Sequence, residues 1–149
     1  MGSEMCIRDR DNTFHSHPGY YIDYFEMRLA QLQVLHNLHY EIKKIRKMPK
    51  QALVIADYIM YMADYVVEMN IPDQQIEKLE EISEQMKQEE LPKTREEFEG
   101  RALLYHILMD LEEFLVYKKR FVNGLDEKKL RIYWKQEMEQ KDSANELQK

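Results

Sequence analysis

Residue types that build cross-links, tight turns and membrane spans are scarce in this sequence. Its 149 residues include one Cys, four Gly and four Pro, and no apolar run reaches the roughly 18 residues that cross a bilayer. A single Cys excludes a disulfide framework and a cysteine-based zinc site. The few Gly and Pro argue against collagen-like, loop-rich and many-turned all-β folds. The net charge of −6 gives no footprint for nucleic-acid binding.

The residues that are present suit one folded helical domain. Apolar residues make up 44% of the chain and charged residues 34%, which argues against disorder. The length fits one domain better than two. Composition therefore predicts an all-α domain and leaves its activity open.

The N-terminal residues do not share the pattern of the rest. Residues 1–10 have no periodicity and no apolar core of a signal peptide, and Met5–Arg10 resembles translated adapter sequence. We therefore treat 1–14 as an artefact-like or disordered leader and expect the natural chain to begin further upstream. Residues 15–124 form the expected domain, and 125–149 are expected to be an amphipathic helix with a frayed tail.

Apolar residues recur at spacings of three and four, which predicts helices over 20–47, 50–69, 73–88, 94–123 and 126–140. Thr94 and Glu97 form a capping box at the start of the fourth helix. Short connections predict an antiparallel up-down four-helix bundle with a short additional C-terminal helix. The second helix is expected to be mostly buried. The expected core face of the first helix consists of Ile22, Phe25, Leu29, Leu32, Leu35, Leu38, Ile42 and Ile45.

Histidines give the weak metal-ligand candidates, namely His15, His17, His36 and His39. A helical i, i+3 His pair can share a divalent ion. A di-iron bundle, however, uses Glu-x-x-His pairs, and none occurs here. The alternative is that His36 and His39 are ordinary packing or surface residues, so no metal is assigned.

Other reactive patterns are weak or missing. Asp57, Asp64 and Glu68 share a helix face with Tyr61 and would form either an acidic pocket or a solvated stripe. No Gly-rich phosphate loop and no Gly-x-Ser-x-Gly nucleophile motif is present. The sequence therefore predicts no catalytic residue, no cofactor and no enzyme activity.

The fifth helix places aromatic residues among basic ones. This composition fits either an interfacial membrane segment or a helix docked on the bundle with a charged outer face. Together with the basic end of the fourth helix, it supplies candidates for contact with an anionic membrane surface. These candidates are Lys118, Lys119, Arg120, Lys128, Lys129, Arg131 and Trp134.

The most specific motif is Leu91-Pro92-Lys93-Thr94-Arg95-Glu96-Glu97-Phe98-Glu99-Gly100-Arg101-Ala102. With the segment His17–Arg28, it resembles the C-terminal domain of the bacterial putative aromatic acid exporter family, over about residues 15–122. From the residues alone, Glu97 is expected to pair with Arg101 and Phe98 to enter the core. The alternative gives Arg95 and Arg101 a contact with an anion or a partner surface.

The resemblance implies a non-enzymatic accessory or regulatory domain of a membrane protein whose membrane helices are absent from this chain. Its expected role is oligomerisation, regulation or ligand sensing. Its expected place is the cytoplasmic face of the bacterial plasma membrane. The expected partners are the parent membrane domain, an anionic membrane surface and further copies of the chain, and not nucleic acid. Two alternatives stay open, namely a free-standing metal-binding bundle and a helical protein-interaction module.

Overall fold

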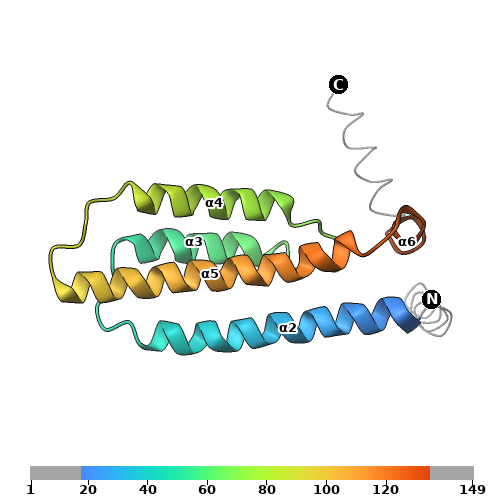
Figure 1. The fold of residues 1–149 in the computed structure, drawn as a ribbon, viewed down its shortest axis with the longest axis horizontal. Helices are drawn as coiled ribbons and strands as arrows, with labels where there is room; N and C mark the ends of the chain where they lie inside the picture. The colour runs from blue at the N-terminus through green and yellow to red at the C-terminus, as the bar shows by residue number, and fades with distance from the viewer. Residues whose placement is uncertain (1–17, 135–149) are drawn as a thin grey trace, which may run out of the picture.

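The computed structural model describes residues 18–134, and in this part the fold is all-α (Figure 1). Four long helices and a short fifth follow one another, as the sequence predicted. None of the described helices combines the length and the apolar character that crossing a membrane requires. The helices are α2 (Pro18–Lys43), α3 (Gln51–Ala63), α4 (Asp73–Lys87), α5 (Arg95–Asn123) and α6 (Glu127–Tyr133).

The four long helices run alternately up and down, and α5 is the central element (Figure 1). It packs against α2, α3 and α4, and α3 also packs against α4. At 1.5 Å per residue α5 is about 43 Å long, whereas α3 is only about 20 Å long. The ends of α2 and α5 therefore extend together past α3, and α6 lies there (Figure 1). We call this end the α6 pole.

Local chemistry explains where the helices begin and end. Pro18 opens α2, at a position where its missing N–H is not needed. The α3 helix ends at Ala63, earlier than the expected Met69. Lys118 donates hydrogen bonds to the main-chain oxygens of Val67 and Glu68 and so satisfies carbonyls outside the helix.

Two clusters of buried apolar residues hold the bundle together. The main cluster lies along the centre and includes Leu104, Leu111 and Tyr58, each at most 2% exposed. The second lies at the α6 pole, where Tyr20, Phe121 and Trp134 are packed together. The α6 helix therefore covers the extended ends of α2 and α5.

The predicted core face of α2 is wrong. Its buried apolar residues are Tyr20, Met27, Val34 and Leu38, and of the predicted set only Leu38 and the partly buried Ile45 contact the core. The other six predicted residues are 40–65% exposed. The helix carries apolar residues on two faces, and α5 covers the face that also contains Gln31. The exposed six are Ile22, Phe25, Leu29, Leu32, Leu35 and Ile42.

Two further burial predictions are corrected. The α3 helix buries one stripe only, while Leu53 and Met60 are 69% and 74% exposed. The cause is that α3 packs against α4 and α5 but, among the described helices, has no backbone contact with α2. Phe98 does not enter the core and is 62% exposed, because the first turn of α5 projects beyond the neighbouring helices (Figure 1).

Candidate functional site

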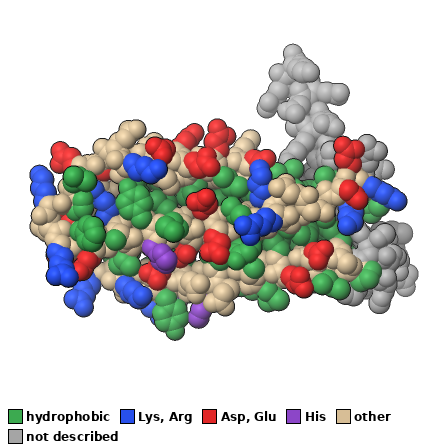
Figure 2. Space-filling view, viewed as in Figure 1, with side chains coloured by type: hydrophobic (Ala, Val, Ile, Leu, Met, Phe, Trp, Pro, Cys, Tyr) green, Lys and Arg blue, Asp and Glu red, His purple; other side chains and the backbone are tan. Residues whose placement is uncertain are grey.

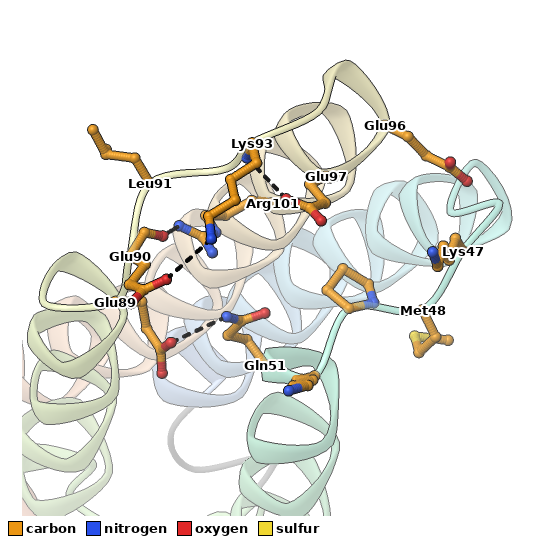
Figure 3. A pocket seen from close by; sticks show the side chains of 12 residues that line it. Lys47, Met48, Gln51, Glu89, Glu90, Leu91, Lys93, Glu96, Glu97 and Arg101 are labelled. Atoms are coloured by element: carbon orange, nitrogen blue, oxygen red, sulfur yellow. Dashed lines mark hydrogen bonds and ion pairs between the residues drawn. The ribbon is translucent and has the colours of Figure 1, made fainter.

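The family-like motif lies at the end of the bundle opposite α6, which we call the loop pole. Two connections meet there, residues 44–50 between α2 and α3 and residues 88–94 between α4 and α5. Between them is an open pocket of about 450 Å³ (Figure 3). It is lined by Lys47, Met48, Pro49, Lys50, Gln51, Glu89, Glu90, Leu91, Lys93, Glu96, Glu97 and Arg101.

The predicted capping box forms one wall of this pocket. Thr94 Oγ1 accepts a hydrogen bond from the Glu97 main-chain N–H at 3.1 Å. Glu97 Oε2 in turn accepts from the main-chain N–H of Lys93 at 2.8 Å. This main-chain hydrogen bond is the largest cause that lowers the pKa of Glu97. The box therefore holds Glu97 ionised with its carboxylate beside the pocket (Figure 3).

Gly100 lets the α2–α3 connection pack closely against α5. It is buried, and a Cβ atom placed on it would lie only 3.1 Å from Cγ of Pro49. Glycine costs about 1 kcal/mol relative to alanine inside a helix. The missing side chain here admits the proline ring, which gives Gly100 a packing role.

Both arginines of the motif contact residues of this chain that the sequence analysis did not name as their partners. The Arg101 guanidinium donates to the main-chain oxygen of Glu90, across the pocket wall (Figure 3). In the described part of the chain it forms no ion pair with Glu97. Arg95 instead pairs with Glu99, at 3.2 Å, and its side chain is 91% exposed. Arg101 therefore joins α5 to the α4–α5 connection, whereas the Arg95 side chain is on the surface.

Apolar and basic side chains are exposed together at the loop pole. Leu91 is 85% exposed and Met48 67%. Basic side chains gather at this end of the molecule (Figure 2). The pocket lining itself is balanced, with four basic and four acidic residues. The arrangement therefore offers ion pairs and apolar contacts to a partner. No sequence pattern singled out residues 47–51, because only the fold places them beside the motif.

The histidine candidates are only partly placed. His36 and His39 are exposed on α2, and His36 packs edge-on against Tyr40. Within residues 18–134 no three His, Cys, Asp or Glu side chains gather in a way that suits a metal ion. His15 and His17 lie outside the described residues.

The acidic set on α3 does not form a pocket. Asp57 and Asp64 are exposed, which agrees with the solvated-stripe alternative. Glu68 turns away from them and accepts a hydrogen bond from the Tyr20 hydroxyl at 2.8 Å. The Tyr61 ring is covered by the ammonium group of Lys78, 3.8 Å from the ring centre.

Burial corrects two of the membrane-surface candidates at the α6 pole. Trp134 is 3% exposed, and its Nε1 donates to the Tyr20 hydroxyl at 3.1 Å. Lys118 is 4% exposed, and Lys119 pairs with Asp73. Trp134 is therefore docked on the bundle, in line with the second interpretation of this helix. Arg120, Lys128 and Lys129 are exposed, and the side chain of Arg131 lies outside the described part.

Comparison with known proteins supplies a family and one relative. The family model described as "Putative aromatic acid exporter C-terminal domain" matches residues 1–119. The chain is also 29% identical, over 117 residues, to the uncharacterized protein YqjA of Bacillus subtilis. That match covers 78% of this chain and 36% of the relative, so the chain spans about a third of the relative's length. No solved structure matches.

Proposed function

Because the chain belongs to the putative aromatic acid exporter C-terminal domain family, we propose that it is a non-enzymatic accessory domain which holds copies of a membrane protein together. Its place is the cytoplasmic face of that protein. The family description as a C-terminal domain supports a parent with a preceding part. The relative's much greater length supports the same view. The parent's membrane domain is then the first partner of this chain.

The observation that carries the assembly role is the apolar surface left open by the bundle. Leu29 and Leu32 on α2 are 65% and 59% exposed, and Ile22 and Phe25 on the same helix are each 53% exposed. Exposed apolar residues that lie in rows on a folded domain favour protein contact. Hydrophobic side chains are visible along the edge of the molecule where α2 lies (Figure 2).

The charge at the α6 pole supports an orientation towards the membrane. Arg120, Lys128 and Lys129 are exposed there, near the first residue of α2. Basic residues beside a membrane favour its cytoplasmic face, where the lipids are anionic. The α6 pole then faces the membrane, and the loop pole lies about 40 Å away from it, one α2 length.

A membrane-anchored reporter tests the assembly role. The chain is fused behind an unrelated membrane-spanning anchor in bacteria, and two versions carry complementary halves of a split fluorescent protein. We expect several-fold more fluorescence than the anchor gives without the chain, at equal expression. Equal fluorescence from the two would overturn the proposed role.

A further inference from the structure

The exposed apolar row on α2 is a narrow stripe on the side opposite to α5. Ile22, Phe25, Leu29 and Leu32 are each 53–65% exposed. At 100° per residue their centre lies about 175° around the helix from the buried apolar residues of α2. We call these four residues the α2 stripe. It is a second apolar face, for which the described part of the chain has no covering helix.

The spacing of the α2 stripe is that of a coiled-coil seam. The steps are three, four and three residues, and His36 and His39 continue them by four and three. An alternation of three and four keeps one narrow seam facing a partner helix. It thus puts Ile22 and Leu29 at a positions and Phe25 and Leu32 at d positions.

The remaining segments of the chain do not suit this stripe. Residues 135–149 include only Met138, Ala144 and Leu147 as apolar residues, with no seam among them. Residues 1–17 are equally without an apolar repeat. An anionic lipid surface is disfavoured as well, because the acidic Asp23 and Glu26 are exposed beside Ile22.

We infer that the α2 stripe pairs with the same stripe of a second copy, as a parallel, in-register, two-stranded coiled coil. In this register each residue of the α2 stripe packs against the same residue of the second copy. The residues that flank the stripe are compatible with this register as well. In a parallel coiled coil, a residue at a g position contacts the residue at the e position five residues later on the partner helix. Leu35, 40% exposed, then meets Tyr40, 57% exposed, and Arg28 meets Gln33. The inference rests on the proposed assembly role, and it names the surface and the partner.

The small area of the stripe limits the strength of this pairing. At roughly 200 Å² per large side chain, its exposed fractions leave about 450 Å² per copy, and Leu35 with Tyr40 adds about 200 Å². A standard interface covers about 800 Å² per partner. We therefore expect micromolar dissociation in solution, strengthened where two copies share one membrane.

Sedimentation equilibrium from about 5 to 500 µM tests the pairing over the range of such constants. We expect the wild-type mass to rise from 18.2 kDa towards twice that value. The variant Leu29→Glu with Leu32→Glu should stay monomeric, with unchanged circular dichroism. The matched control, Leu53→Glu with Met60→Glu, changes two apolar residues on α3 that are at least as exposed, and it should associate like the wild type.

Cysteine cross-linking tests the orientation, in a chain with Cys6→Ser. Ile22→Cys should form a disulfide-linked dimer under mild oxidation, because the two Ile22 positions adjoin in a parallel pair. In an antiparallel pair Ile22 would lie opposite Leu32, and the two Ile22 positions would be about 15 Å apart. The neighbouring control Asp23→Cys points away from the seam and should react slowly. Equal rates for the two would overturn the parallel pairing.

The outcomes separate this inference from the assembly role. Loss of association in the α3 control but not in the α2 variant would overturn the α2 pairing and leave the assembly role standing. A wild-type monomer throughout, with no fluorescence in the anchored reporter, would overturn both. Sedimentation with phosphatidylserine vesicles that requires Leu29 and Leu32 would assign the stripe to lipid instead.

Discussion

Lys118 lies near the end of α5, where its ammonium group donates hydrogen bonds to the main-chain oxygens of Val67, at 2.7 Å, and of Glu68. It also lies 5.7 Å from the centre of the Trp134 ring. Its neighbour Lys119 is more exposed and pairs with Asp73 on the surface. The two adjacent lysines thus provide a matched pair, one buried and one near solvent.

We predict that Lys118→Met lowers the free energy of unfolding by about 2 kcal/mol, because partly buried carbonyls lose a charged donor. Lys119→Met should cost less than about 1 kcal/mol, as for other surface ion pairs. Urea unfolding of both variants measures the difference. Equal losses would contradict the structural role given to Lys118.

Asp110 is a buried carboxylate on α5, and its Oδ2 atom has no hydrogen-bond partner among the described residues. Burial raises its pKa, and the nearby His106, 3.9 Å away, opposes that shift. Glu113 and Glu41 raise it further. A raised native pKa means that the contribution of Asp110 to stability is present below its unfolded pKa of about 3.9. It is lost as the pH rises through the native pKa.

Asp110→Asn should therefore increase the free energy of unfolding at pH 7, by an amount on the order of 1 kcal/mol. The gain should shrink towards pH 3, where Asp110 is protonated in both states. Thermal unfolding of variant and wild type across this pH range measures the effect. A variant less stable than the wild type at pH 7 would show that the carboxylate stabilises the fold.

At the scale of elements, α6 is docked through Trp134, the one tryptophan of the chain. The indole reaches Tyr20 of α2, whose hydroxyl continues to Glu68. Burial is the main cause that raises the pKa of Tyr20, so this hydroxyl stays protonated as a donor. Three segments far apart in the sequence meet in this chain of hydrogen bonds.

Trp134 fluorescence should therefore not respond to vesicles of phosphatidylserine and phosphatidylcholine in low salt. Any binding should come from exposed basic residues, and Lys128→Glu with Lys129→Glu should remove it without moving the emission maximum. Emission spectra and vesicle sedimentation measure the two effects separately. Quenching of Trp134 by brominated lipid would contradict the docked position.

The sequence was sufficient to predict the helices but not the faces that they bury. Thr94 and Glu97 predicted the start of α5 because capping is a local interaction. The prediction for α2 was wrong because periodicity identifies an apolar face of a helix but does not show which element packs against that face. The covered face contains Gln31, whose amide donates to the Phe114 main-chain oxygen at 2.8 Å. Because this face contains the polar residue Gln31, its sequence pattern resembles that of a solvent-exposed face.

The candidate site was predictable only in part, for the same reason. The motif from Leu91 to Arg101 is contiguous, so it was recognised as a unit. Its partners Met48 and Pro49 come from the α2–α3 connection and Gln51 from the start of α3, and packing alone brings them near. Phe98 was expected in the core, yet the start of α5 extends past the helices that would cover it.

At the scale of the whole molecule, α5 is central and α2, α3 and α4 surround it. This arrangement leaves apolar side chains exposed on α2 and on α3. Among the helices of residues 18–134, the α2–α5 pairing is the most extensive contact, and it leaves the α2 stripe open on the far side. The pairing that we infer for α2 would join copies that share a membrane. The loop pole stays available to a different partner.

The central claim is that this chain assembles its parent through α2. The anchored split reporter, carrying the paired variants, tests it most directly. We predict that Leu29→Glu with Leu32→Glu lowers the fluorescence to the level of the anchor alone, whereas Leu53→Glu with Met60→Glu leaves it at the wild-type level. Fluorescence that survives the α2 change, at equal expression, would contradict the claim.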